Sequence, residues 1–154
     1  MPPLATTVLN AGAIDLLSLW ITNGLPGYKS FADWQTAYFG STTAVNSEPG
    51  ADPDGDGAMN RLEYVTGTNP LLKGDQWEIQ VAESGTQIEI SFVRVANRGF
   101  QVEWTNNLFD AKSWRLLDVP GNEPQFLSTT TVATVRETPG DAQDRFYRVR
   151  VFEP

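Results

Sequence analysis

The spacing of apolar residues changes near residue 75 and divides the chain into two parts. The first part contains a predicted helix with an aromatic face, made of Phe31, Trp34 and Tyr38. Ser30, followed three residues later by Asp33, forms a capping box at the start of this helix. Gly40 can end the helix because glycine readily adopts the left-handed conformation of a helix C-cap. This part of the chain is therefore predicted to be helical.

Two further short helices are predicted in the first part. Residues 15–22 carry apolar side chains at helical spacing, namely Leu16, Leu17, Trp20 and Ile21. Residues 59–66 predict another helix, with Leu62 and Val65 turned inward and Gly67 as its end. Asn69-Pro70 then favours an extended chain, because proline restricts the residue before it.

From Gln76 onward apolar and polar residues alternate, which is typical of half-buried strands. Six short strands are predicted, at residues 77–81, 88–92, 100–104, 114–117, 129–135 and 146–151. Ser84-Gly85 is a candidate hairpin turn between the first two, and residues 97–99 are a candidate for the next pair. The pattern predicts an α+β chain: a helical segment over residues 1–72 and a small antiparallel β-sandwich over residues 73–154.

Residues 52–63 form a twelve-residue loop in which acidic residues alternate with other residues. The sequence Asp-Pro-Asp-Gly-Asp-Gly-Ala-Met-Asn-Arg-Leu-Glu follows the spacing of an EF-hand-like calcium loop, with Gly57 at the sixth place, where the chain must turn sharply. The predicted ligands are the side chains or carbonyl oxygens of Asp52, Asp54, Asp56, Ala58, Asn60 and Glu63. Calcium takes six to eight oxygen ligands, which this set can supply. The alternative is an acidic surface turn without an ion.

Composition narrows the possible functions. The chain has no cysteine and no histidine, which excludes Ser-His-Asp triads, cysteine nucleophiles, His/Cys zinc sites and disulfides. A net charge of −8 disfavours a nucleic-acid partner. No spacing marks a glycosidase pair among the 19 carboxylates, so we expect no enzyme. The five Trp residues leave open a sugar-stacking surface, although those in phase with apolar neighbours are expected in the core.

The stretch from Asp52 to Pro70 resembles bacterial thrombospondin type 3-like and dockerin-like calcium repeats. It is also similar to C-terminal segments of exported planctomycete and verrucomicrobial proteins, where an aromatic helix precedes the loop. In those segments a β-domain follows, with patterns like residues 103–114 and 145–151 here. The resemblance implies a secreted or cell-surface accessory module with a structural calcium. Dockerins pair two such loops to bind cohesin, and only one loop is present here.

We therefore expect a non-catalytic calcium-binding structural module of an exported bacterial protein. The alternative is a carbohydrate-binding module with a structural calcium. The expected partners are Ca²⁺ and either a neighbouring domain of the parent polypeptide or a polysaccharide, with no nucleic acid and no membrane insertion. Residues 14–21 are too short to span a bilayer and follow no basic residue, so they do not predict a signal peptide. An exported chain of this kind is expected to be a mature fragment or part of a longer polypeptide.

Overall fold

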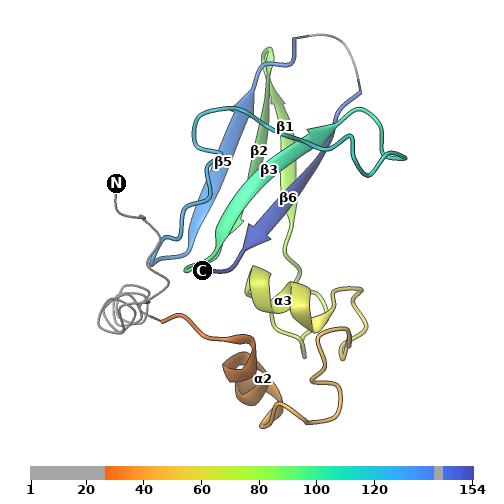
Figure 1. Cartoon of the computed structure of the whole chain (residues 1–154), viewed down its shortest axis with the longest axis vertical. Helices are drawn as coiled ribbons and strands as arrows, with labels where there is room; N and C mark the ends of the chain where they lie inside the picture. Colours follow the sequence, from red (N-terminus) through yellow and green to blue (C-terminus); the bar gives the residue numbers. More distant parts are fainter. Residues whose placement is uncertain (1–26, 141–143) are drawn as a thin grey trace, which may run out of the picture.

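The structure, a computed structural model, describes residues 27–140 and 144–154. Two short helices precede two three-stranded antiparallel sheets, and the helices lie at one end of the sandwich that the sheets form (Figure 1). The helix predicted over residues 15–22 lies outside the described residues. None of the described helices is long and apolar enough to cross a membrane.

Helix α2 (Phe31–Phe39) begins and ends where the sequence predicts. Ser30 accepts a hydrogen bond from the backbone of Asp33, whose carboxylate accepts one from the backbone of Ser30, which completes the capping box. Gly40 ends the helix in the left-handed region with φ 79°. Aromatic rings join α2 to the next helix: the ring of Phe31 lies 5.2 Å from that of Tyr64, centroid to centroid.

Helix α3 (Asn60–Thr66) ends at Gly67, as predicted, but its buried face differs from the predicted one. The helix buries mainly polar residues, namely Asn60, Glu63, Tyr64 and Thr66. Leu62, expected inward, is 49% exposed, and Val65 is only half-buried. The apolar spacing misleads because this helix carries candidate ligands for the neighbouring acidic loop, and these occupy the protected side.

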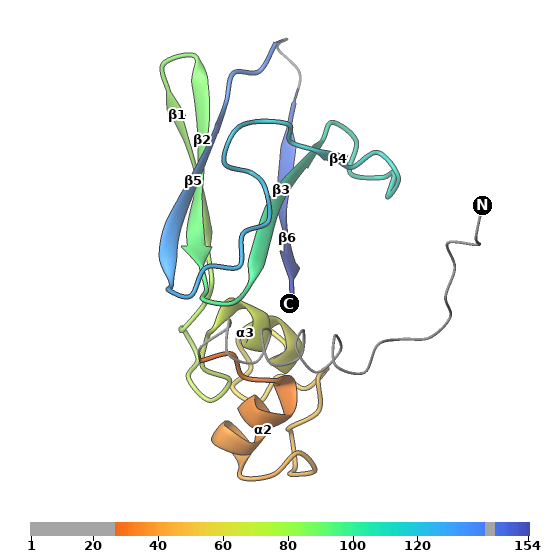
Figure 2. The same cartoon turned by 60° about the vertical axis from the view of Figure 1, so that its left-hand side comes forward.

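The six strands form two antiparallel sheets that face each other (Figure 2). One sheet has the order β1-β2-β5, with bounds Ile79–Ser84, Gln87–Arg94 and Thr131–Glu137. The other has the order β4-β3-β6, with bounds Arg115–Leu116, Gly99–Thr105 and Phe146–Phe152. The hairpin predicted at Ser84-Gly85 is present between β1 and β2. The hairpin predicted at residues 97–99 is wrong, because β2 and β3 belong to different sheets and the connection crosses between them.

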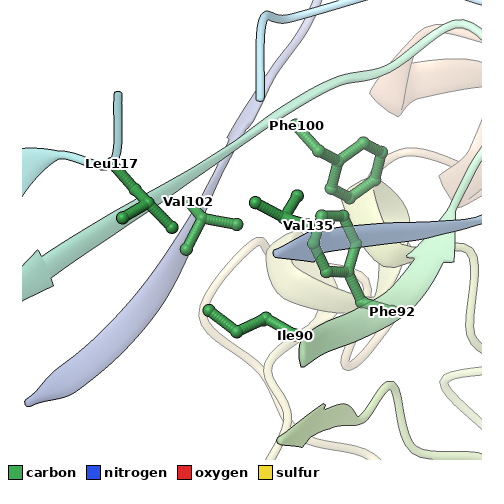
Figure 3. Packing of buried hydrophobic residues seen from close by; sticks show 6 residues of the cluster. All are labelled: Ile90, Phe92, Phe100, Val102, Leu117 and Val135. Carbon is green, nitrogen blue, oxygen red and sulfur yellow. The ribbon is translucent and has the colours of Figure 1, made fainter. Parts of the chain in front are cut away.

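The core lies between the sheets and consists of alternate residues from both. Its buried members are Ile90, Phe92, Phe100, Val102, Leu117 and Val135 (Figure 3). Trp77 and Trp104 pack against this cluster while remaining partly exposed. The two-residue alternation therefore identified the buried face of the central strands correctly, because inward and outward positions alternate along a strand.

Candidate metal centre

Three aspartates meet at the curled part of the loop. Asp52, Asp54 and Asp56 each bring one carboxylate oxygen within 4.8 Å of the others. The backbone curls because Asp52 accepts hydrogen bonds from Gly55 N (2.9 Å) and Gly57 N (3.0 Å). Both glycines have positive φ, 71° and 99°, a conformation that other residues adopt at a cost. The sequence prediction that these three carboxylates converge is thus confirmed.

The second and third aspartates each keep one oxygen unused. Asp54 Oδ1 accepts from the backbone of Asp56 (3.1 Å), and Asp56 Oδ1 accepts from that of Ala58 (2.7 Å). The other oxygen of each carboxylate, Oδ2, is buried and has no hydrogen-bond partner. A buried carboxylate oxygen without a donor is costly unless a cation compensates for its charge. These two atoms are therefore free to ligate an ion.

Glu63 lies in the first turn of α3 and is the most unusual group of the site. Its side chain is 1% exposed, and neither carboxylate oxygen has a hydrogen-bond partner. Burial, together with the charges of Asp54, Asp56 and Asp52, raises the pKa of Glu63 to about 7. Glu63 is not among the residues whose carboxylate oxygens meet within 4.8 Å, so its place as a ligand of the same ion stays a prediction.

Asn60, one turn before Glu63, ties α3 to the segment that precedes the loop. Its Nδ2 donates to the carbonyl oxygens of Asn46 (2.7 Å) and Glu48 (2.8 Å), while its Oδ1 is buried without a partner. Gln35 of α2 donates to the carbonyl of Ser47 (2.7 Å). Residues 41–51 thus lie between α2 and the acidic loop, and side-chain amides hold them in place.

Several contributors to the site were missed by the sequence analysis. Gln76 donates to the carbonyl of Asp56 (3.1 Å), and the charge of Asp75 acts on Glu63. Local spacing gives no signal for these residues, because they approach the loop only through the fold. Ala58 is half-buried and donates its N–H to Asp56. Its carbonyl oxygen stays a predicted ligand.

The remaining candidate chemistry has ordinary structural explanations. Glu103 of β3 is 8% exposed and pairs with Arg148 and Arg150 of the neighbouring strand β6. Burial raises the pKa of Glu103, but hydrogen bonds from the two arginines outweigh it and hold the pKa below its ordinary value. None of the four described Trp residues is fully exposed: Trp34 is buried, and guanidinium groups lie over the rings of Trp104 and Trp114.

Comparisons of the chain with protein-family models, with curated proteins and with solved structures found no match. Two features of the described residues therefore define the protein: a short helical segment on a two-sheet antiparallel sandwich, and an acidic cluster that could hold a metal ion.

Proposed function

We propose that this chain is a non-catalytic, calcium-stabilised structural module. The observation that carries the proposal is the buried Glu63 carboxylate, which has no hydrogen-bond donor and whose pKa is raised by burial and by the charges of three aspartates. An uncompensated buried carboxylate is strongly unfavourable, and a divalent cation removes that cost while satisfying both oxygens. Calcium binding explains why the fold places this residue inside rather than on its surface.

The donor set favours calcium over other metals. All six candidate residues offer hard oxygen ligands, and the chain has no histidine or cysteine to attract zinc or copper. Magnesium requires an octahedral shell at short distances and keeps several waters. A loop with irregularly placed carboxylate, amide and carbonyl oxygens suits the looser shell of calcium better.

A structural role follows from how the ligands are distributed. Asp52, Asp54 and Asp56 belong to the loop, whereas Asn60 and Glu63 belong to α3. An ion held by both groups fastens the loop to the helix. With Glu63 supplying two oxygens, the six candidate residues fill the six to eight positions that calcium takes, which leaves little room for a substrate.

The resemblance to the calcium repeats of exported bacterial proteins supports a place outside the cell. Extracellular modules of this kind work with dissociation constants of about 10⁻⁴–10⁻³ M, a range suited to a permanent structural ion where calcium is plentiful. We propose attachment or spacing of a larger neighbouring domain as the use of the module. The carbohydrate-binding alternative gains no support from the described Trp residues, since Trp34 is buried and other rings are covered.

Calorimetry on the whole chain tests the proposal. One calcium should bind, magnesium should compete poorly, and Glu63→Gln should lower calcium affinity by on the order of tenfold or more, because it removes one charge and weakens two-oxygen closure. Glu83→Gln, which changes an exposed carboxylate at the end of β1, is the matched control and should leave affinity unchanged. Equal affinity in the Glu63 and Glu83 variants would refute the ligand assignment.

A further inference from the structure

The helix that carries Glu63 is also contacted by an arginine of the sandwich, Arg98. Tyr64, the next residue along α3, is 4% exposed. The guanidinium carbon of Arg98 lies 4.5 Å from the centroid of the Tyr64 ring and 5.0 Å from that of Tyr28. A cation over an aromatic face is attracted to the ring, and the attraction is larger where water is excluded. Arg98 itself is 5% exposed, so this contact is within the protein.

Further contacts restrain the same helix. The hydroxyl of Tyr64 donates to the carbonyl of Lys29 (2.9 Å), which fixes the ring that Arg98 covers. Arg61 pairs with Glu153 after β6, and its guanidinium carbon lies 5.3 Å from the Tyr64 ring centroid. At the end of the helix, a Cβ on Gly67 would lie 3.1 Å from the side chain of Val95, so α3 sits close against the β2–β3 connection.

Among the described residues of the sandwich, Arg98 is the one buried cation that lies over the rings of Tyr64 and Tyr28. Arg61 also lies over the Tyr64 ring but belongs to α3 itself. Glu63 and Tyr64 are adjacent on α3. The charges of the aspartates act on Glu63, and the guanidinium of Arg98 lies over the ring of Tyr64.

We infer that Arg98 is a positioning residue for the metal site, which acts by holding Tyr64 and thereby the orientation of Glu63 and Asn60. This inference rests on the proposed calcium binding. Ion binding and the Arg98–Tyr64 contact then stabilise one orientation of α3, so each strengthens the other. Such coupling is reciprocal: what the arginine adds to calcium affinity, calcium adds to the stability of the arginine contact.

The chain offers a matched control. Arg94, at the end of β2, is 6% exposed, almost the same as Arg98, but its guanidinium donates to Gln125 (3.3 Å) and to the carbonyl of Gly121 (3.5 Å) on the connection before β5. Among the described residues, no hydrogen bond, ion pair or ring contact joins Arg94 to α3. Arg94→Met and Arg98→Met therefore remove equally buried cations from one sheet and the adjoining connection, and only the second touches α3.

Calcium titration of the whole chain, in the wild type and both variants, distinguishes an effect of Arg98 on calcium binding from a general contribution of a buried arginine to stability. We expect Arg98→Met to weaken calcium binding by on the order of tenfold, within the usual range of coupling between sites. Arg94→Met should lower the melting temperature but leave the calcium dissociation constant unchanged. Arg98→Lys, which keeps a cation able to cover the ring, should recover part of the affinity. Equal calcium affinity in Arg98→Met and Arg94→Met would overturn the inference.

A second measurement does not depend on calcium. In chelator, amide exchange over residues 60–66 should be faster in Arg98→Met than in Arg94→Met, because α3 has lost its anchor. Unchanged exchange there would overturn the anchoring role. If Arg98→Met does not fold, Arg98→Lys and Tyr64→Leu are compared with Arg94→Lys in the same two assays. Failure of the wild type to bind calcium would reject the proposed function, while the exchange result would still decide whether Arg98 anchors α3.

Discussion

The helical segment and the sandwich are stabilised by different kinds of interaction. The sandwich has an apolar core of alternate strand residues, with Ile90, Phe100 and Val102 fully buried. The described helical segment, residues 27–72, buries the aromatic side chains of Trp34 and Tyr64 together with Pro70, and its other buried residues are polar, such as Asn60 and Glu63. Apolar burial needs no partner, whereas a buried carboxylate needs a donor or a cation, and both oxygens of Glu63 are without a hydrogen-bond partner in the protein. If calcium binds as proposed, the sandwich is self-sufficient and the helical segment depends on an ion.

The largest expected effect comes from a core substitution in the sandwich, the part that needs no ion. Phe100 is 0% exposed and contacts both Trp77 and Phe92, with ring centroids 6.1 and 5.7 Å away. Phe100→Ala should cost about 3–5 kcal/mol, from lost burial and the cavity left behind. Chemical denaturation should show the same loss with calcium and with chelator, because the core does not involve the ion. Val132→Ala, at a position that is 72% exposed, is the control and should change little. If the loss of stability in Phe100→Ala depended strongly on calcium, the sandwich core and the ion site would belong to one cooperative unit, and the distinction between the two parts would be wrong.

Calcium removal tests the dependent part and should have the next largest effect. An ion that binds only the folded form stabilises it by about 2.7 kcal/mol at a hundredfold excess over its dissociation constant. For a chain of this size we expect the melting temperature to fall by roughly 5–10 °C in chelator. Amide exchange should rise first over residues 41–70 and less in the strands after Gln76. A melting temperature and amide-exchange rates that are the same with and without chelator would contradict a structural role for the ion.

The effect of pH on stability should be intermediate in size, and its sign follows from the pKa of Glu63. Its pKa in the folded protein is raised from 4.5 to about 7, so the folded protein without calcium binds this proton more readily than the unfolded chain does. Stability without calcium therefore increases as the pH falls from about 7 towards 4.5. Calcium needs the ionised carboxylate, so its stabilisation decreases over the same range. The difference between the melting temperatures with calcium and with chelator should shrink as the pH falls through this window.

Glu63→Gln sharpens this prediction. The variant has no titrating group at this position, so its stability in chelator should lack the increase that the wild type shows below about pH 7. At neutral pH it should also be more stable than the wild type in chelator, because a buried, unpartnered charge has been removed. A melting temperature in chelator that has the same pH profile in both proteins would show that Glu63 does not carry the effect.

The two parts also differ in how far the sequence could predict them. In the sandwich, alternation identified Ile90 and Phe100 as buried, because side-chain direction along a strand is a local property. It could not identify the sheet of each strand, since turn residues at 97–99 are equally compatible with a hairpin and with a crossing between sheets. Which strands pair depends on the packing of the whole chain.

In the metal centre, spacing correctly brought Asp52, Asp54 and Asp56 together, because their convergence depends on a local turn. The contacts of Gln76 with the loop and of Arg98 with α3 have no local signal, since these residues are distant in sequence and meet them only through the fold. The inward face of α3 was also assigned wrongly. Apolar periodicity assumes that a helix buries its apolar side chains, and this helix buries its polar ones.

The smallest expected effect tests directly whether α3 buries its polar face rather than its apolar face. If Leu62 were a core residue, as the helical spacing predicts, replacing it by a small polar residue would cost at least about 2–5 kcal/mol. Leu62 is 49% exposed in the structure, so Leu62→Ser should lower the free energy of unfolding by no more than about 1–1.5 kcal/mol, from half-buried apolar area and helix propensity. Denaturation in excess calcium, with the ion site filled in both proteins, measures the difference. A loss of several kcal/mol would mean that α3 buries its apolar face, and the placement of Glu63 inside the protein would then be wrong as well.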